Sequence, residues 1–409
     1  MDVFDGLTEL AASRLRASAL APYVQPFWDR LIEQQYSRST ARHYLNCVAH
    51  FALWSRRRRF DLHALDQHAA NFINQHLPRC ACAAPVQRSR HQVRAALGHL
   101  RAIVRAAGVE QHDHPIGPVD EQLRRFDEHL LHVKGLAAST RVRRATIVRA
   151  LLSSTSNAAT PSADELRQFL TQELSRVSAA SGGASATAVR SYLRFRAFEG
   201  DRVEHLLPVV AAPANWRLAP LPQTLSPDEV DRLLGAFPAD LPSRLRGYAL
   251  VRCVVDLGLR SSEVIALALD DINWLAGTVR ISKGKSRRVD VLPLPHVTGA
   301  AIADYLRSER PQTASRRIFV RHVAPVDEPV AAGVVRRAVR AAYRRAGLPY
   351  TRVHILRHTL ASRLLNTGGT LKEVADVLRH RELNTTLIYA KVDFGRLGQV
   401  AMPWPGSRT

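Results

Sequence analysis

Apolar residues recur at helical spacing along most of the chain, and local sequence signals mark where one new domain begins. Ser226-Pro227-Asp228-Glu229 combines an N-cap serine, a proline at the first helical position and the glutamate of a capping box. Apolar residues then continue at helical spacing to about Leu257. This pattern predicts that a new domain begins near residue 223.

Two short segments of this domain alternate between apolar and polar residues in the manner of β-strands. They are Thr278–Ser282 and Arg288–Leu292, and the turn Lys283–Ser286 joins them, which is the signal of a β-hairpin. Arg316–Val320 is a candidate for a further strand, and helical spacing resumes from about Ala331. The pattern therefore predicts a mainly helical protein whose C-terminal domain is mixed α+β, with a small sheet or hairpin.

A proline-rich stretch, residues 206–222, separates this domain from a helical N-terminal half, and Arg217 is its single charged residue. We predict a linker there, with helical modules at 1–112 and 116–205 before it and one domain at 223–409 after it. The two modules contain a weak internal repeat with a spacing of roughly 100 residues. Any two amphipathic helical stretches can be aligned this well, so duplication and coincidence both stay open. The aligned pairs are Phe27 with Phe126, Leu31 with Leu130, Thr40 with Thr140, Phe72 with Phe169 and Leu97 with Leu193.

The composition adds a strong positive charge to this picture. The chain has 409 residues, and its 58 Lys and Arg exceed its 36 Asp and Glu, for a formal net charge of +22. A GC-rich genome would favour Arg over Lys, but it would not produce the excess over acidic residues. A surface this basic attracts polyanions, of which nucleic acid is the first candidate. Hydrophobic residues make up 46% of the chain, which is enough to bury sizeable cores.

The cysteines and the apolar runs suggest neither a metal site nor a membrane segment. Cys80-Ala81-Cys82 lacks the two-residue gap that is usual in zinc pairs, and it suits a disulfide poorly. We therefore expect reduced thiols, including Cys47 and Cys253, and neither metal nor cofactor. The N-terminus does not resemble a signal peptide, and no run approaches the roughly 18 apolar residues of a membrane span. These features predict a cytoplasmic protein without membrane contact.

Two residues of the C-terminal domain are weak candidates for a role in catalysis. Arg260 follows Leu257-Gly258-Leu259, where one helix is expected to end and another to begin. A partly buried arginine needs an anionic partner, and a structural pair with Glu263 would explain it equally well. Lys283 lies in the hairpin turn, where a lysine is usually solvated, although a mobile ammonium there could reach a leaving-group oxygen.

A more specific pattern lies nearer the C-terminus. His354 and Arg357 are three residues apart and share one helical face. His380 and Tyr389 follow, and Asn384-Thr385-Thr386 offers a cap for a last short helix that would present Tyr389. Two histidines, two arginines and a tyrosine in this order are difficult to explain by packing alone.

In these residues the chain resembles the tyrosine recombinase, or phage integrase, family. The resemblance covers about residues 223–393, and the upstream helices are similar to the core-binding domain of that family. One departure is Leu378-Arg379-His380, where the family usually has Leu-Gly-His, and we expect the missing glycine to affect the turn that holds His380. The matching residues are Arg260, Lys283, His354, Arg357, His380 and Tyr389.

The resemblance implies a site-specific recombinase that cuts and rejoins DNA through a covalent 3′-phosphotyrosine at Tyr389, without metal or ATP. Arg260 and Arg357 would donate hydrogen bonds to the non-bridging phosphate oxygens. Ionising a free tyrosine at neutral pH costs roughly 4 kcal/mol, since its pKa is ~10, and His354 could accept the proton. Lys283 is the candidate acid that protonates the departing deoxyribose oxygen.

Two groups of arginines are candidates for contacts with DNA. The first shares one face of a predicted helix at 331–346, and the second follows Thr140; in each case a solvated basic face is the alternative. The first group is Arg337, Arg340 and Arg344, and the second is Arg141, Arg143 and Arg144.

The expected partner is double-stranded DNA with specific recombination sites, bound by a homotetramer or by an assembly with sister recombinases. The long N-terminal half favours an integrase or transposase of a mobile element. The alternatives are a Xer-like dimer resolvase, a type IB topoisomerase-like enzyme and, in a different class, a non-catalytic DNA-binding accessory protein. The presence of Tyr389 and of both arginines favours an enzyme.

Overall fold

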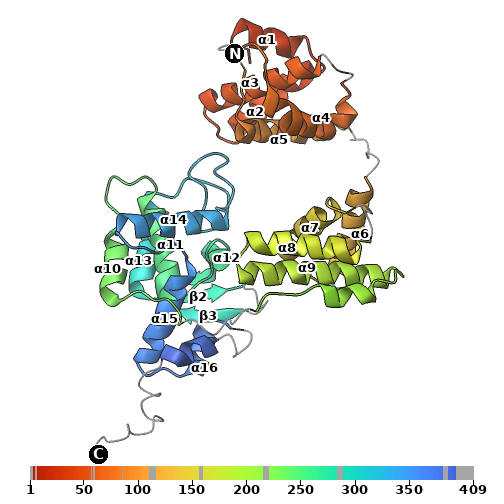
Figure 1. Cartoon of the computed structure of the whole chain (residues 1–409). Helices are drawn as coiled ribbons and strands as arrows, with labels where there is room; N and C mark the ends of the chain where they lie inside the picture. Colours follow the sequence, from red (N-terminus) through yellow and green to blue (C-terminus); the bar gives the residue numbers. More distant parts are fainter. Residues whose placement is uncertain are drawn as a thin grey trace, which may run out of the picture. The chain divides into compact units, whose positions relative to one another are not determined.

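The structure is a computed structural model, and it is mostly helical with one small sheet, as the sequence predicts (Figure 1). It describes residues 3–4, 7–56, 58, 60–84, 86–109, 117–155, 160–214, 221–282, 289–380 and 386–392. The chain divides into two compact units, one formed by residues 110–217 and the other by residues 1–109 and 218–409. Three regions with separate hydrophobic cores are described below: the N-terminal region (3–109), the middle region (117–214) and the C-terminal region (221–392).

The N-terminal region is a helical bundle around an aromatic core. Ser37 caps its longest helix, accepting a hydrogen bond from the backbone N–H of Thr40. Phe27, Phe51 and Phe72 are fully buried at its centre. The elements are α1 (Glu9–Arg16), α2 (Ala21–Glu33), α3 (Arg38–Ser55), η1 (Leu62–Ala64), α4 (Leu65–Asn71), the π-helical turn η2 (Phe72–His76), η3 (Leu77–Arg79) and α5 (Arg90–Ala106).

The described residues of the middle region form four helices and a short 3-10 helix. Leu206 and Val210 are buried in its core, so the first residues of the predicted linker pack against this region. The boundaries predicted for the modules, the linker and the last domain stay predictions. The elements are α6 (Pro118–His132), α7 (Ala138–Leu152), α8 (Ala163–Arg176), α9 (Ala179–Phe198) and η4 (Glu204–Val209).

The helix order of these two regions agrees with the suggested repeat. In the N-terminal region α2, α3 and α5 pack against one another, and in the middle region α6, α7 and α9 do the same. The aligned apolar pairs lie in corresponding elements and are buried in both regions. Thr40 and Thr140 are each the third residue of the second helix in their set. These correspondences agree with a duplication, which the sequence alone left open beside coincidence.

The C-terminal region builds its core around α11, which packs against α13, α14 and α15. Its first helix, α10, begins with the predicted capping box, in which Ser226 and Glu229 bond to each other's backbone N–H. The elements before the sheet are α10 (Pro227–Gly235), α11 (Arg244–Leu257), α12 (Ser261–Val264) and η5 (Leu269–Asp271). Those after it are α13 (His296–Ser308), α14 (Ala332–Arg345), α15 (His354–Asn366), α16 (Leu371–Val377) and η7 (Leu387–Val392).

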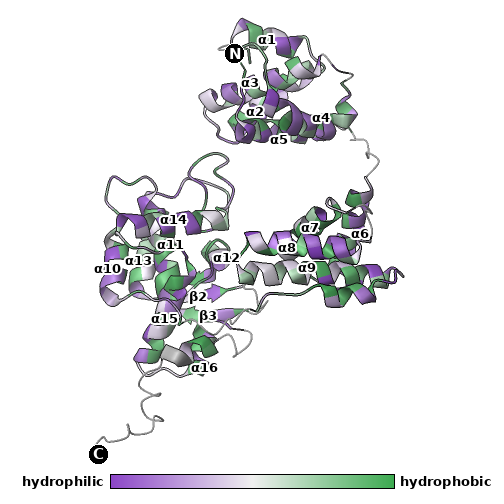
Figure 2. Ribbon diagram, viewed as in Figure 1, coloured by the Kyte–Doolittle hydropathy of each residue, from purple (hydrophilic) through white to green (hydrophobic). Residues whose placement is uncertain are grey.

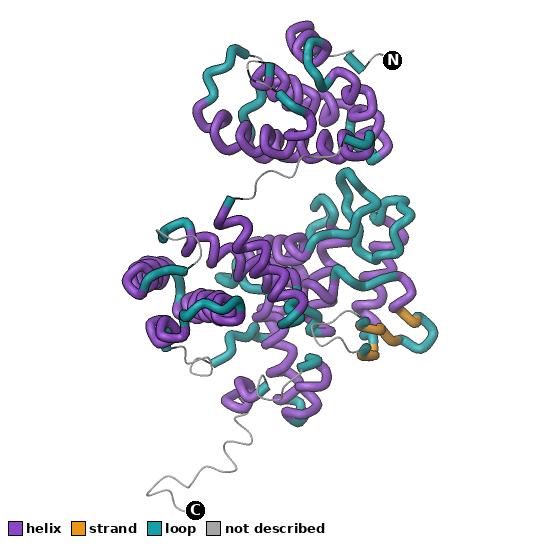
Figure 3. Tube along the Cα trace, turned by 90° about the vertical axis from the view of Figure 1, so that its right-hand side faces the viewer, coloured by secondary structure: helices purple, strands orange, loops and turns teal. Residues whose placement is uncertain are grey.

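The sheet is an antiparallel meander of β1 (Ile272–Asn273), β2 (Thr278–Ile281) and β3 (Asp290–Pro293), which Figure 3 shows in orange. The predicted hairpin is β2 with β3, in which Val279 is opposite Leu292. Its turn, residues 283–288 with Lys283, lies outside the described residues. The prediction of a further strand at 316–320 is wrong, because Arg317 and Val320 make isolated bridges, outside the sheet.

Hydrophilic and hydrophobic residues share the same helices throughout the chain (Figure 2). Among the described residues, none of the helices combines the length and apolar character that crossing a membrane requires.

Candidate active site

A glycine-terminated helix positions Arg260. Helix α11 ends at Leu257, and its C-cap Gly258 has φ +58, in the left-handed region that glycine favours. A Cβ on Gly258 would lie 2.9 Å from Cδ2 of Leu360 and of Leu378, so a side chain would also collide with two packed leucines. The turn places Arg260 at the N-cap of α12, which confirms the predicted helix junction.

Glu263 is a buried carboxylate that holds two arginines. Its Oε1 accepts a hydrogen bond from Arg260 at 2.6 Å, and its Oε2 accepts one from Arg379 at 2.7 Å. Oε2 also accepts the backbone N–H of Arg260 at 2.9 Å. Burial alone would raise the pKa of Glu263, but the charges of Arg379 and Arg260 and their hydrogen bonds lower it overall. The carboxylate is therefore ionised and fixes both guanidiniums.

Arg379 occupies the position at which the family usually has glycine. Its φ is +54, so the backbone keeps the left-handed conformation that a glycine would adopt there. Such a conformation costs a non-glycine residue on the order of 1 kcal/mol. The buried ion pair with Glu263 offsets this cost, and the backbone N–H of His380 donates to the carbonyl of Ala375 at 2.9 Å. The turn before His380 thus retains a glycine-like backbone without the glycine.

Arg357 lies on α15 and is buried, with 5% of its surface exposed. Its two terminal nitrogens donate to the carbonyls of Gly258 and Leu378, which tie it to the end of α11 and to the turn before His380. Burial, together with the charges of Arg260 and Arg379, lowers the pKa of Arg357 to about 9. In the described part of the site, three neighbouring guanidiniums are thus accompanied by the carboxylate of Glu263, which pairs with Arg260 and Arg379, and the excess of positive charge favours a bound anion.

Tyr389 lies on the short 3-10 helix η7 and is 2% exposed. Its hydroxyl is 2.7 Å from Nδ1 of His358. Burial raises the pKa of Tyr389 to about 12, although the charge of Arg357 opposes the rise. Burial, with the neighbouring His354 and Arg357, lowers the pKa of His358 to about 4, so His358 is neutral at neutral pH. A neutral imidazole whose Nδ1 carries no proton can accept the hydrogen bond of the phenol.

The contact between His358 and the Tyr389 hydroxyl is one to which the sequence reasoning assigned no role. The signal was present, because His358 follows Arg357 directly and lies one helical turn beyond His354. Its importance depends on the packing of η7 against α15, which periodicity does not reveal.

The two predicted histidines lie at the edges of the arginine cluster. His354, in the first turn of α15, is exposed to solvent; partial desolvation and the charges of Arg357 and Arg260 lower its pKa. Nδ1 of His380 is 2.6 Å from Oγ1 of Thr386, the buried residue that directly precedes η7. Burial and the charge of Arg357 lower the pKa of His380 to about 4. His380 thus connects the arginine cluster to the segment that carries Tyr389.

The structure brings most of the predicted catalytic residues together around α15, and their roles stay predictions. Lys283 lies outside the described residues. The residues gathered there are Arg260, His354, Arg357, His380 and Tyr389.

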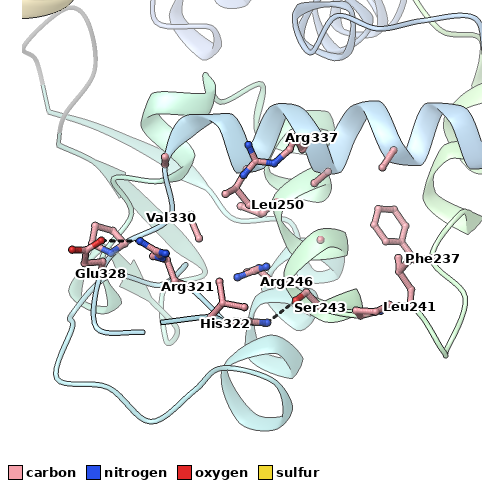
Figure 4. A pocket seen from close by; sticks show the side chains of 18 of the residues that line it. Phe237, Leu241, Ser243, Arg246, Leu250, Arg321, His322, Glu328, Val330 and Arg337 are labelled. Atoms are coloured by element: carbon pink, nitrogen blue, oxygen red, sulfur yellow. Dashed lines mark hydrogen bonds and ion pairs between the residues drawn. The ribbon is translucent and has the colours of Figure 1, made fainter. Parts of the chain in front are cut away.

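The predicted basic helix is α14. Its arginines and its apolar residues lie on different faces, as the sequence indicated. Arg337, Arg340 and Arg344 are exposed, whereas Val335 and Val339 are buried. Near this helix lies a cavity of about 670 Å³. Four arginines line the cavity, Arg246, Arg321, Arg337 and Arg345, and Figure 4 labels the first three.

The second group of predicted DNA-binding arginines, on α7, is partly engaged within the middle region. Arg141 forms an ion pair with Asp127, and Arg144 donates to Oγ of Ser191 at 2.9 Å. Arg143 is exposed. Contact with DNA stays a prediction for all three, and Arg143 is the best placed for it.

Comparison with known proteins connects this site to a family. The sequence profile of the phage integrase family matches residues 223–396. The chain is 36% identical over 410 residues to y4rA of Sinorhizobium fredii, a protein named as an integrase/recombinase, and the match covers 97% of this chain and 98% of the relative.

Two solved structures have a similar fold. One is the site-specific recombinase XerH bound to palindromic difH substrate in a post-cleavage complex: the TM-score is 0.55 at 18% identity, over 84% of this chain and 96% of that one. The other is the integrase of transposon Tn1549 with a circular intermediate DNA: the TM-score is 0.52 at 14% identity, over 67% of this chain and 99% of that one. With the relative that matches nearly end to end, these findings show that the chain belongs to the phage integrase family of tyrosine recombinases.

Proposed function

We propose that this protein is a site-specific DNA recombinase that cuts and rejoins DNA strands through a covalent 3′-phosphotyrosine at Tyr389. The observation that carries the proposal is the excess of positive charge beside a tyrosine. Arg260 and Arg379 share the buried carboxylate of Glu263, whereas the neighbouring Arg357 donates only to backbone carbonyls. The Tyr389 hydroxyl lies on the adjoining segment. A phosphodiester supplies the negative charge that this cluster lacks.

The arginines would stabilise the phosphate during the reaction. Attack on phosphorus increases the negative charge on the non-bridging oxygens, and fixed guanidiniums oppose that charge without reorganising. Glu263 fixes Arg260, and two backbone carbonyls fix Arg357, so both are preorganised. In this role Arg379 is a positioning residue, because it acts through Glu263.

The tyrosine would attack as follows. Oη of Tyr389 forms a bond to phosphorus, the bond from phosphorus to the 5′ oxygen breaks, and that oxygen leaves as a hydroxyl. With a pKa of about 12, ionising Tyr389 at pH 7 costs roughly 7 kcal/mol, so a proton acceptor is needed. His354 was the acceptor expected from the sequence, whereas His358 is the residue in hydrogen-bond contact. The phosphotyrosine conserves the phosphoester, so reversal of the same steps rejoins the strand without ATP.

Lys283 is the proposed general acid for the leaving oxygen. Replacing that oxygen by sulfur, in a 5′-phosphorothiolate substrate, gives a leaving group that needs no proton. We expect Lys283→Ala to cleave ordinary DNA slowly, by a factor of about 10² or more, and to recover most of the loss on the sulfur substrate. Equal defects on both substrates would assign the acid elsewhere, with Lys285 as the next candidate.

The proposed substrate is duplex DNA that carries the recombination sites of a mobile element, and the reaction would integrate or transpose that element. The long N-terminal half supports this assignment over resolution of dimers. Assembly as a homotetramer or with sister recombinases, a cytoplasmic location and independence from metal and ATP in the reaction stay predictions. The exposed arginines of α14, together with Arg143, are the proposed contacts to the DNA backbone.

A nicking and religation assay separates this enzyme from a non-catalytic DNA-binding protein. Supercoiled plasmid that carries the DNA flanking the gene is incubated with the protein, without Mg²⁺ or ATP. We expect nicked and relaxed topoisomers with the native protein and neither with Arg357→Ala, which also controls for contaminating nucleases. Tight binding of the plasmid without any nicking by the native protein would contradict the proposal and indicate a regulator.

A further inference from the structure

Four potential metal ligands gather in the N-terminal region, outside the site described above. They are His50, His76, Cys80 and Cys82, and one ligand atom from each lies within 4.8 Å of all the others. His50 belongs to α3, His76 ends the π-helical turn η2, and the cysteines lie in the segment between η3 and α5. Helix α3 and the stretch 76–82 thus converge on one point.

Two of the distances between these atoms match those around a tetrahedral metal ion. Nε2 of His50 is 3.4 Å from Sγ of Cys80, and Nε2 of His76 is 3.5 Å from Sγ of Cys82. With Zn–S bonds of ~2.3 Å and Zn–N bonds of ~2.0 Å at tetrahedral angles, the N···S separation is about 3.5 Å. One such pair alone would be an ordinary thiol–imidazole hydrogen bond. Two pairs whose four atoms converge favour a common centre.

The hydrogen bonding of His50 prepares it for coordination. His50 is fully buried, and its Nδ1 is 2.7 Å from the carbonyl oxygen of Gln87. Because a carbonyl only accepts, Nδ1 carries the proton, and the neutral ring has its lone pair on Nε2, the atom that faces Cys80. Metal-binding histidines typically have this second hydrogen bond to a carbonyl, which fixes the tautomer and the ring orientation.

The surroundings hold the other ligands in place. The ring of His76 stacks on Phe72 with centroids 5.1 Å apart, and the ring of His50 meets Phe72 edge-on at 5.0 Å. Arg88 donates to the carbonyl of Cys82 at 3.2 Å, and this hydrogen bond fixes the backbone of the segment that carries the two cysteines. A π-helical turn such as η2 is a rare feature that often occurs at functional sites.

The ligand set indicates which metal would bind. Two sulfurs and two nitrogens in a tetrahedral arrangement suit zinc, and four protein ligands leave no open position for catalysis. Two thiolates and two neutral imidazoles balance the charge of Zn²⁺, as a partly buried site requires. We propose that His50, His76, Cys80 and Cys82 bind a structural zinc ion that joins α3, η2 and the segment before α5.

The metal content of the full-length protein tests this proposal. The protein, produced without a polyhistidine tag in zinc-supplemented cells, should contain about one zinc ion per chain by elemental analysis. Cys80→Ser combined with Cys82→Ser should reduce the zinc content at least tenfold, and His76→Ala should also reduce it. The matched controls are Cys47→Ala, a buried cysteine of the same region, and His91→Ala, an exposed histidine on α5; both should retain zinc.

Cobalt substitution of the native protein keeps the test independent of variant folding. Co²⁺ bound by these ligands should give a thiolate-to-cobalt charge-transfer band and the intense visible bands of tetrahedral cobalt, and the double-serine variant should lack the charge-transfer band. A chelator should lower the melting temperature of the native zinc protein, and added Zn²⁺ should restore it. Native protein that contains no zinc and gives no thiolate band with Co²⁺ would overturn the proposal. Zinc retained in full by the double-serine variant would overturn it as well.

Discussion

The two sides of the proposed active site, the arginines expected to bind phosphate and the tyrosine expected to attack it, are held in different ways. On the phosphate side, Glu263 fixes Arg260 and Arg379, and two backbone carbonyls fix Arg357. On the nucleophile side, Tyr389 lies on a 3-10 helix of six residues, and its hydroxyl is bonded to one side chain, His358. The cation cluster is thus part of the fold, whereas the tyrosine is buried, protonated and held by a short segment. Changes on the phosphate side should therefore affect both stability and chemistry, whereas removing only the Tyr389 hydroxyl should abolish the chemistry at the cost of one hydrogen bond, about 1 kcal/mol of stability.

The largest effect should come from removing a phosphate-binding arginine. Arg357→Ala or Arg260→Ala should raise the barrier to strand cleavage by about 3 kcal/mol or more, by analogy with the loss of one oxyanion donor. Arg→Lys should restore little, because lysine lacks the planar fork of donors. Single-turnover cleavage rates measure both effects, and Arg363→Ala, at an exposed position of the same helix, is the matched control. Near-normal cleavage by the lysine variants would contradict the assignment.

A smaller effect is expected on stability from Glu263. Glu263→Gln should destabilise the protein by about 3 kcal/mol, because it leaves Arg379 buried without its anionic partner. In the Arg379→Gly background, which also removes the residue with positive φ, the same change should cost less. Chemical denaturation of the four proteins of this double-mutant cycle measures the coupling. Additive effects would mean that the two side chains are not coupled.

The smallest predicted effect is a loss of stability in mild acid. Burial lowers the pKa of both His358 and His380 to about 4, from 6.5. Between these values the unfolded chain binds protons that the folded chain does not, so stability falls as the pH falls from about 6.5 towards 4. At about pH 5 each histidine would cost on the order of 2 kcal/mol. Melting temperatures measured from pH 7 to pH 5 should fall less for His358→Gln than for the native protein; parallel curves would show that His358 is not responsible.

Features set by neighbouring residues were predictable from the sequence. The capping box at Ser226, the glycine-ended helix before Arg260 and the β2–β3 hairpin are local patterns, and the structure has all three. The prediction of a strand at 316–320 was wrong, because alternation of apolar and polar residues suits any extended segment. This segment makes isolated bridges instead of joining the sheet.

Features set by long-range packing were not predictable. Cys80 and Cys82 do not have the usual zinc spacing as a pair. His76 is close to them in sequence, but His50 comes from α3, which the sequence does not place beside them. The contact of His358 with Tyr389 depends on where η7 packs, and the left-handed backbone of Arg379 depends on its buried partner Glu263.

The most direct test of the account is the identity of the residue that becomes covalently attached to DNA. A suicide substrate, nicked so that the cleaved fragment diffuses away, traps the covalent intermediate, which is resolved on a denaturing gel and mapped by mass spectrometry of its peptide. The native protein and Tyr350→Phe, a change at another tyrosine of the C-terminal region, should both form an adduct, mapped to Tyr389. Tyr389→Phe should bind the DNA with unchanged affinity and form no adduct. A trapped adduct with Tyr389→Phe, or a native adduct mapped to another residue, would contradict the account.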